Sequence, residues 1–353
     1  MLTPIVLPPN QPVRFYRGGA GIARFRGVPR PNEYSPEDFI GSTTEVASGA
    51  GVGLTRLDDD TTLRERVEAD PIGYLGPRHV ETYGTDTGLL VKLLDTGERL
   101  LVHFHPDGDF ARQHLDCPHG KSEAWYIIDV QVDKDSVDPG AGQVYLGFRQ
   151  DVPAETVDRW MAGQRSEEML GALNRIPVQP GDAFFVPAGI PHAIGTGITL
   201  VELQEPVDFS ILLEWEGFAI DGPREGHLGL GFDVALQALD RSAWPAERLA
   251  ALRGPRPQAD VAPGVTRLLP PAADEFFRAD ALRVRDTTVT LDPDFAIIVV
   301  LDGEGTLQAG GSTLPLRRGD AVLVPYGAGE SRISGSIDAM RCRPAGPTST
   351  KKD

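Results

Sequence analysis

Short apolar runs separated by glycine, proline and aspartate dominate the chain. Residues 143–148, 183–186 and 198–204 are rich in valine, leucine, isoleucine and phenylalanine, and turn residues stand near them. Such runs are typical of β-strands. Residues 90–105 have the pattern of two strands around an Asp-Thr-Gly turn, which predicts a hairpin. With forty glycines and thirty prolines, the pattern predicts a mainly β protein.

Helical spacing interrupts the strand pattern in a few places. Thr62 stands before 63–69, where it can cap a short helix. Residues 154–173 have apolar positions at helical intervals and are predicted to form a helical insertion, divided into two short helices at Gly163. This insertion is either a lid over the mouth of a barrel or a helix pair on the surface.

One strand motif occurs twice. Gly319–Gly327, with the sequence GDAVLVPYG, repeats the pattern of Gly181–Gly189, GDAFFVPAG. An internal repeat of this kind predicts two similar domains. We place the first at 1–255 and the second at 265–348, with a Pro-rich linker between them and a disordered tail at 349–353.

Histidines and a glutamate near these strands have the spacing of a metal site. His103 and His105 are two residues apart on a predicted strand, so their imidazoles share a face and can chelate one ion. Glu123 begins another predicted strand and adds a carboxylate if the two strands are neighbours. The rigid PAGIP bend then delivers His192. In the repeat, Glu330 replaces this last histidine and no His-x-His is present, so we expect the second domain to be structural and metal-free.

This order of motifs, His-x-His, a later Glu, then G-x5-P-x-G-x2-H, resembles the cupin superfamily. Within it, LLVKLLDTGERLLVHFHPD, HGKSEAWYIID and QPGDAFFVPAGIPHAIGTGITLVELQ resemble type I mannose-6-phosphate isomerase. The resemblance implies two jelly-roll barrels and a metal-dependent aldose–ketose isomerase acting on a sugar or sugar phosphate. The ligands suit Zn²⁺, Fe²⁺, Mn²⁺, Co²⁺ or Ni²⁺, and the resemblance favours zinc. His103 departs from the family, which has glutamine there.

The resemblance also implies roles for residues around the metal. Glu202 and Lys121 match family residues that are candidates for the acid and base of proton transfer. Lys92 and Asp208 match others near the substrate. Trp125 alternates onto the face of the metal-ligating glutamate, and we take it as a further candidate for substrate contact.

Two departures concern the substrate. Leu101 replaces a family serine placed near the substrate, and Leu212 replaces a family arginine implicated in catalysis or phosphate binding. Because arginine is the natural bidentate partner of a phosphate, we expect a substrate other than mannose 6-phosphate, and one that need not be phosphorylated. Arg224, from the next loop, is an alternative source of the missing charge.

Composition narrows the class of protein further. The net charge of −17 argues against nucleic acid and anionic membrane surfaces. The two cysteines, Cys117 and Cys342, make no disulfide framework, and no apolar run is long enough to span a bilayer. We expect a cytoplasmic monomer or homodimer. The rival classes are a non-haem iron dioxygenase of the cupin type and a non-catalytic cupin that binds a sugar.

Overall fold

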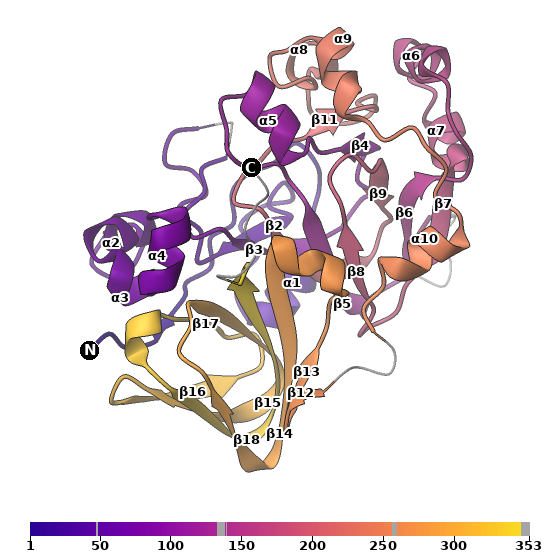
Figure 1. Cartoon of the computed structure of the whole chain (residues 1–353). Coiled ribbons are helices and arrows are strands. Elements are labelled where there is room, and N and C mark those ends of the chain that lie inside the picture. Colours follow the sequence, from indigo (N-terminus) through magenta and orange to yellow (C-terminus); the bar gives the residue numbers. More distant parts are fainter. Residues whose placement is uncertain (47–48, 133–137, 139, 256–259, 347–353) are drawn as a thin grey trace.

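A computed structural model gives the fold of the chain. The two β-rich bodies lie one above the other in Figure 1, and the body made mostly by the C-terminal part is drawn in orange and yellow. The structure describes residues 1–46, 49–132, 138, 140–255 and 260–346. The predicted disordered tail, 349–353, therefore lies outside the described residues. The prediction of a mainly β fold is confirmed.

The first barrel consists of two five-stranded sheets. One has the order β2 (Glu37–Ile40), β3 (Leu90–Asp95), β10 (Ile198–Gln204), β5 (Glu123–Val130) and β8 (Ala183–Val186). The other has the order β11 (Ile211–Leu212), β4 (His103–Phe104), β9 (His192–Ile194), β6 (Gln143–Phe148) and β7 (Leu173–Pro177).

The predicted hairpin at 90–105 is wrong, although both of its strands form. β3 pairs with β2 and β10, whereas β4 pairs with β9 and β11 in the other sheet. The chain crosses between the sheets at 96–102, as a jelly roll requires. The local signals of strand, turn and strand are the same for a hairpin and for a crossover, so the sequence pattern does not distinguish them.

The second barrel is built on one eight-stranded sheet. Its order is β1 (Ile5–Val6), β17 (Ala321–Val324), β15 (Ala296–Ala309), β18 (Ser331–Pro344), β14 (Phe277–Leu291), β13 (Val265–Arg267) and β12 (Asp260–Ala262), and β16 (Ser312–Arg317) pairs with β15. The N-terminal strand β1 thus joins the second barrel by pairing with β17, which departs from the predicted division at 1–255.

A continuous apolar core joins the two barrels. Phe185 of β8 stacks on Phe276, with ring centroids 5.6 Å apart, and meets the edge of Phe277 at 6.2 Å. Met340 and Cys342 of β18 are buried in the same core as the strands of the first barrel. Because the core is shared, the two barrels pack as one body rather than as beads on a linker.

Short helices surround the first barrel (Figure 1). Thr62 caps α2 as predicted, because its hydroxyl accepts from the backbone N–H of Glu65 and the Glu65 carboxylate accepts in return. None of the helices in the described part of the chain is long and apolar enough to cross a membrane. The helices are α1 (Gly21–Arg26), α2 (Leu63–Ala69), α3 (Pro71–Leu75), α4 (Pro77–Tyr83), α5 (Gly108–His114), α6 (Ala154–Ala162), α7 (Ser166–Ala172), α8 (Gly222–Glu225), α9 (Phe232–Ala235) and α10 (Ala246–Ala251), with 3₁₀ turns at Leu236–Ala238, Pro271–Glu275 and Tyr326–Ala328.

The helical insertion forms the predicted pair, α6 and α7, and α6 ends at Gly163. The pair packs on the outer side of the sheet that contains β6 and β7 (Figure 1), where Trp160 contacts Phe148 with ring centroids 6.2 Å apart. Neither helix contributes a residue to the pocket described below. The arrangement is that of a surface helix pair and not of a lid.

Candidate metal centre and active site

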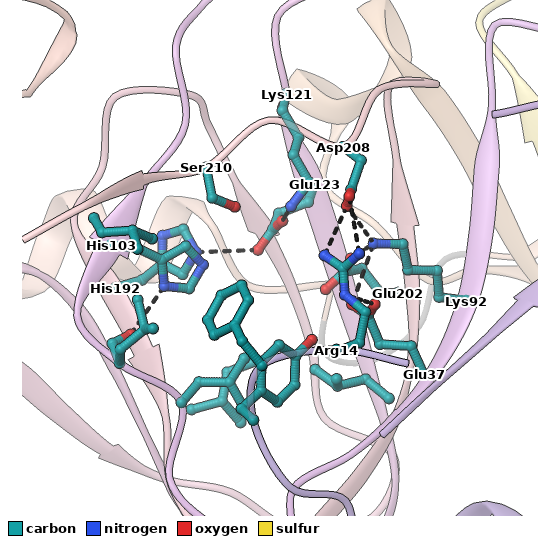
Figure 2. Close-up of a pocket in the computed structure, with 17 residues that line it drawn as sticks. Arg14, Glu37, Lys92, His103, Lys121, Glu123, His192, Glu202, Asp208 and Ser210 are labelled. Carbon is teal, nitrogen blue, oxygen red and sulfur yellow. Dashed lines mark hydrogen bonds and ion pairs between the residues drawn. The ribbon is translucent and has the colours of Figure 1, made fainter. Parts of the chain in front are cut away.

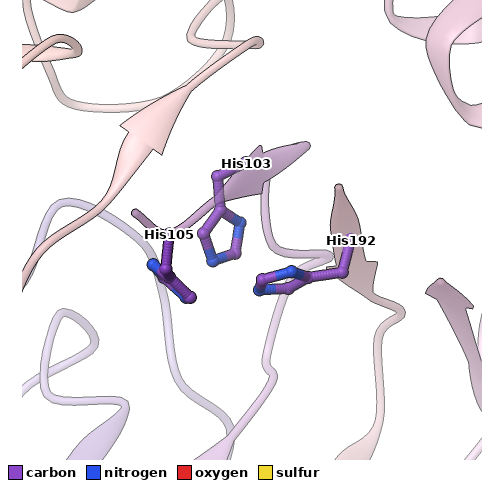
Figure 3. A group of neighbouring side chains, drawn as sticks. All are labelled: His103, His105 and His192. Atoms are coloured by element: carbon purple, nitrogen blue, oxygen red, sulfur yellow. The ribbon is translucent and has the colours of Figure 1, made fainter. Parts of the chain in front are cut away.

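Three imidazoles converge inside the first barrel. His103 of β4 lies directly across from His192 of β9 in the sheet register, and their ring centroids are 4.2 Å apart. His105 lies just beyond β4, with its ring 5.0 Å from that of His103 and 4.9 Å from that of His192. One ring nitrogen from each falls within 4.8 Å of the others, and all three residues are buried. Figure 3 shows the rings pointing toward one another.

Backbone contacts fix the orientation of two of these rings. The Nδ1 atoms of His103 and His192 lie 2.9 Å from the carbonyl oxygens of Leu101 and Ile190. A carbonyl can only accept, so each Nδ1 carries the proton and each Nε2 presents a lone pair to the centre of the group. This is the usual arrangement around a histidine that binds a metal.

Glu123 completes the donor set from the opposite sheet. Its carboxylate oxygens lie 3.1 Å from His105 Nε2 and 3.4 Å from His192 Nε2. His192 Nε2 is buried without a hydrogen-bond partner, so a lone pair faces a carboxylate oxygen. A cation between these two acceptors would compensate both of them. The residues therefore fit a divalent ion held by three nitrogens and one oxygen.

The charge states also suit a metal. Burial lowers the pKa of His105 to about 3 and that of His192 to about 4, so both rings are neutral near pH 7. Burial alone would raise the pKa of the Glu123 carboxyl, but Lys121 and the nearby histidines hold it well below its ordinary value. Neutral imidazoles and an ionised carboxylate are the forms that ligate.

Two side chains support Glu123 directly. The indole Nε1 of Trp125 donates to Glu123 Oε1 at 2.9 Å, and the Lys121 ammonium donates to Oε2 at 3.0 Å. Lys121 Nζ also lies 2.9 Å from His105 Nε2. Trp125 is fully buried and does not line the pocket. Its position favours a role for Trp125 in orienting Glu123, and not the substrate contact that we expected.

A cluster of ion pairs forms the other end of the site, to the right in Figure 2. Lys92 Nζ lies 3.3 Å from Glu37, 3.7 Å from Glu202 and 3.7 Å from Asp208. Arg14 binds Asp208 through both terminal nitrogens, at 2.9 and 3.1 Å, and Glu37 through Nε at 2.8 Å. The two cations and three carboxylates share one buried network.

The Glu202 carboxyl has a raised pKa in this network. Burial raises its pKa to about 7, and the negative charge of Glu123 adds to the shift against the opposing effect of Lys121 and Lys92. The pKa of the Asp208 carboxyl shifts in the opposite direction, because Arg14 and Lys92 lower it by more than burial raises it. A carboxyl that titrates near neutral pH can both accept and donate a proton.

Both ends open into one pocket of about 500 Å³ (Figure 2). The structure brings nearly all of the predicted residues to its wall, and His105 lies buried among the other ligands. Sequence reasoning missed further polar residues, most of which come from segments without a clear motif. The buried glutamate in SPEDFI, flanked by an apolar run, was the one available signal. The missed residues are Arg14, Tyr16, Glu37 and Ser210.

A jelly-roll barrel that encloses three histidines and a glutamate defines the chain as a cupin with a candidate metal centre. Residues 271–344 match the family model described as mannose-6-phosphate isomerase, cupin domain. Mannose-6-phosphate isomerase ManA of Bacillus subtilis is 30% identical over 257 residues, which cover 71% of this chain and 73% of that protein. The chain therefore belongs to the mannose-6-phosphate isomerase family.

Other relatives agree. The mannose-6-phosphate isomerase of Streptococcus mutans is 27% identical over 277 residues, covering 76% of this chain and 79% of that protein. The crystal structure of a mannose 6-phosphate isomerase from Bacillus subtilis covers 97% of this chain and all of its own, with a TM-score of 0.69 and 22% identity. The shared fold thus extends over both barrels.

Proposed function

We propose that the protein is a metal-dependent aldose–ketose isomerase. The observation that carries the proposal is the presence, in one pocket, of the His/Glu donor set and of Glu202, whose pKa is about 7. Isomerisation moves a proton between two neighbouring carbons, and it needs a group that takes and returns that proton near neutral pH. Membership of the mannose-6-phosphate isomerase family supports the same reaction class.

One divalent ion, zinc by family resemblance, would be held by His103, His105, Glu123 and His192. When bound, such an ion supplies Lewis-acid polarisation of sugar oxygens. Trp125 positions the ligating carboxylate through its 2.9 Å hydrogen bond.

Glu202 and Lys121 are the proposed acid and base. Glu202 faces the pocket from β10, and its backbone register pairs it with Lys92 of β3, so the lysine ammonium is held beside its carboxylate. Lys121 reaches the pocket next to the ligands and can donate a hydrogen bond to a substrate oxygen there. Asp208 and Lys92 fix the opposite wall and orient the sugar hydroxyls.

We also propose that the preferred substrate carries no phosphate. Leu101 and Leu212 line the pocket where the family resemblance implies a serine and an arginine. The pocket's cations, Arg14, Lys92 and Lys121, each already have a carboxylate partner. A phosphate dianion would have to displace those carboxylates or be buried beside them, and both carry a free-energy cost. Sugar hydroxyls can bond to the ion pairs as they stand.

The test is an isomerisation assay on zinc-loaded protein with free mannose, fructose and lyxose, and with mannose 6-phosphate. Interconversion of a free aldose and ketose, with metal content measured on the same sample, supports both proposals. A mannose 6-phosphate kcat/KM about a hundredfold above that of any free sugar would contradict the substrate proposal alone. Oxygen consumption, or sugar binding without turnover, would contradict the isomerase itself.

A further inference from the structure

The strand register identifies where the second barrel places the counterpart of the active site. In the first barrel, Phe184 follows the Gly-Asp turn and pairs with Trp125. Trp125 pairs with Glu202 on β10, and Glu202 pairs with Lys92 on β3. These cross-strand pairs lead from the repeated motif to the proposed acid/base residue in three steps.

The same steps can be followed in the second barrel. Val322 follows the equivalent Gly-Asp turn and pairs with Ile298 on β15. Ile298 pairs with Arg341 on β18, and Arg341 pairs with Asp280 on β14. Arg341 therefore takes the position that Glu202 holds in the first barrel, and Asp280 takes that of the lysine.

A cleft of about 970 Å³ lies at this position, open to solvent. Its polar lining consists of four arginines, three aspartates and one threonine. Two of the arginines, Arg341 and Arg343, lie two residues apart on one face of β18. Both are almost fully buried, at 4% and 8% exposure. Buried guanidinium groups side by side are costly unless anions compensate them.

The protein's own acceptors compensate them only in part. Arg343 donates to the buried Asp280 and, at 3.4 Å, to Asp294, but its Nε is buried without a hydrogen-bond partner. Arg341 donates to the side chain and to the backbone carbonyl of Asp292, each at 2.7 Å. The buried residues alone, two arginines and one aspartate, carry a net charge of +1.

Asp292 and the partly exposed Asp294 supply further negative charge from the solvent side. The Asp292 side chain is 69% exposed, so its carboxylate reaches in from solvent to Arg341 at 2.7 Å and approaches Arg343 at 4.0 Å. The exposed carboxylate itself can return to water at little cost, and an anion that takes its place keeps the buried Arg341 guanidinium compensated. The other two arginines of the cleft, Arg267 and Arg278, pair with Asp274 and Asp294, and Arg343 also approaches Asp294 at 3.4 Å.

We propose that the mouth of the second barrel binds a small phosphate group, as inorganic phosphate or a phosphate monoester, between Arg341 and Arg343, with the Asp292 side chain displaced. Two guanidinium groups offer the bidentate donors that phosphate oxygens accept. The site is separate from the proposed catalytic pocket and shares no lining residue with it.

Titration calorimetry of the zinc-loaded protein with inorganic phosphate tests the proposal. Asp292→Asn keeps the shape but removes the competing charge, and we expect phosphate to bind at least about threefold more tightly. Arg341→Gln removes a charge-assisted pair, and we expect binding at least about tenfold weaker. Phosphate bound at the metal centre contributes equally to all of these proteins, so the differences report on this site. Glucose 6-phosphate in place of phosphate distinguishes a monoester from the free ion.

Arg332→Gln is the matched control, because it removes an exposed arginine of the same strand β18 that pairs with the exposed Glu330. It should bind phosphate as the wild type does. Circular dichroism establishes whether Arg341→Gln is folded, and Asp292→Asn decides the question if it is not. Equal phosphate affinity in wild type, Asp292→Asn and Arg332→Gln, or no binding to any of them, would overturn the proposal.

Discussion

The two barrels contain one turn of nearly identical backbone geometry. They differ at the positions that hold the candidate metal ligands in the first barrel. Gly181 and Gly319 both have a φ of 88°. The following aspartates, Asp182 and Asp320, each accept a backbone N–H from three residues earlier at 2.9 Å. A glycine is required at both positions because an L side chain is strained at this φ.

Beyond the turn, equivalent strand positions in the two barrels carry side chains of opposite charge. The position of Glu202 is held by Arg341, and the register places Ala296 where the first barrel has Glu123. Glu330, which replaces His192 in the motif, is exposed and pairs with Arg332. The comparison teaches that the repeated motif specifies a turn and a strand, whereas the site depends on a few inward positions that the motif does not include.

We expect the largest difference between the two barrels from matched substitutions at the last position of the repeated motif. His192→Ala removes a buried ligand, so we expect loss of most of the bound metal and a fall in kcat/KM of more than about a thousandfold. Glu330→Ala, the matched change in the second barrel, should leave both unchanged. Metal analysis and kinetics on the same samples check this, and retention of metal by His192→Ala would contradict the ligand assignment.

Glu202→Gln should lower kcat by about a hundredfold or more, because the amide cannot take or return a proton. Metal content should stay at the wild-type level, since Glu202 is not a proposed ligand. Lys121→Ala should lower kcat to a similar extent. Wild-type rates in both variants on the true substrate would show that the acid and base lie elsewhere.

Trp125→Phe tests the support of the metal ligand. It keeps the aromatic volume but removes the hydrogen bond to Glu123, and we expect about tenfold weaker metal affinity. Ile298 holds the equivalent position in the second barrel, so Ile298→Val serves as a control that changes packing without a polar contact. Competition with a metal chelator measures the affinity, and equal values in wild type and Trp125→Phe would exclude the positioning role.

Leu212→Arg introduces an inward guanidinium of the kind that the second barrel already has. We expect kcat/KM for mannose 6-phosphate to rise about tenfold relative to free mannose, because an arginine without a carboxylate partner can bind the phosphate. Leu212→Met controls for the change in packing. A ratio unaffected by the arginine would place the selectivity at some other part of the pocket.

The smallest effect concerns pH. The pKa of Glu202 in the folded protein, about 7, lies above the ordinary value for glutamate, so the folded state holds this proton more tightly than the unfolded chain. Its contribution to stability is complete below the unfolded pKa and is lost as pH rises through about 7. The Tm of Glu202→Gln relative to wild type should therefore increase from about pH 5 to about pH 8. Calorimetry at matched metal content measures it, and a constant difference would refute the raised pKa.

Much of the candidate site could be predicted because its residues belong to motifs. The His-x-His strand, Glu123 and the bend before His192 were recognisable, and the comparisons confirm the family that they indicated. The prediction for Glu123 was conditional on its strand neighbouring that of His103, but β5 lies in the other sheet and Glu123 meets the histidines across the barrel. Arg14 could not be predicted, because a single charged residue in a segment without a motif gives no sign of burial.

By itself, the sequence determined the local features: which runs are strands, that Thr62 caps a helix, and that glycine occupies the two equivalent turns. Each depends on the backbone preferences of a few adjacent residues. The tertiary structure alone decided which sheet each strand joins, and so which charges share a pocket. Only there does Arg14 meet Asp208, 194 residues away in the chain, because burial and Coulomb interactions depend on distance in space and not on separation along the sequence.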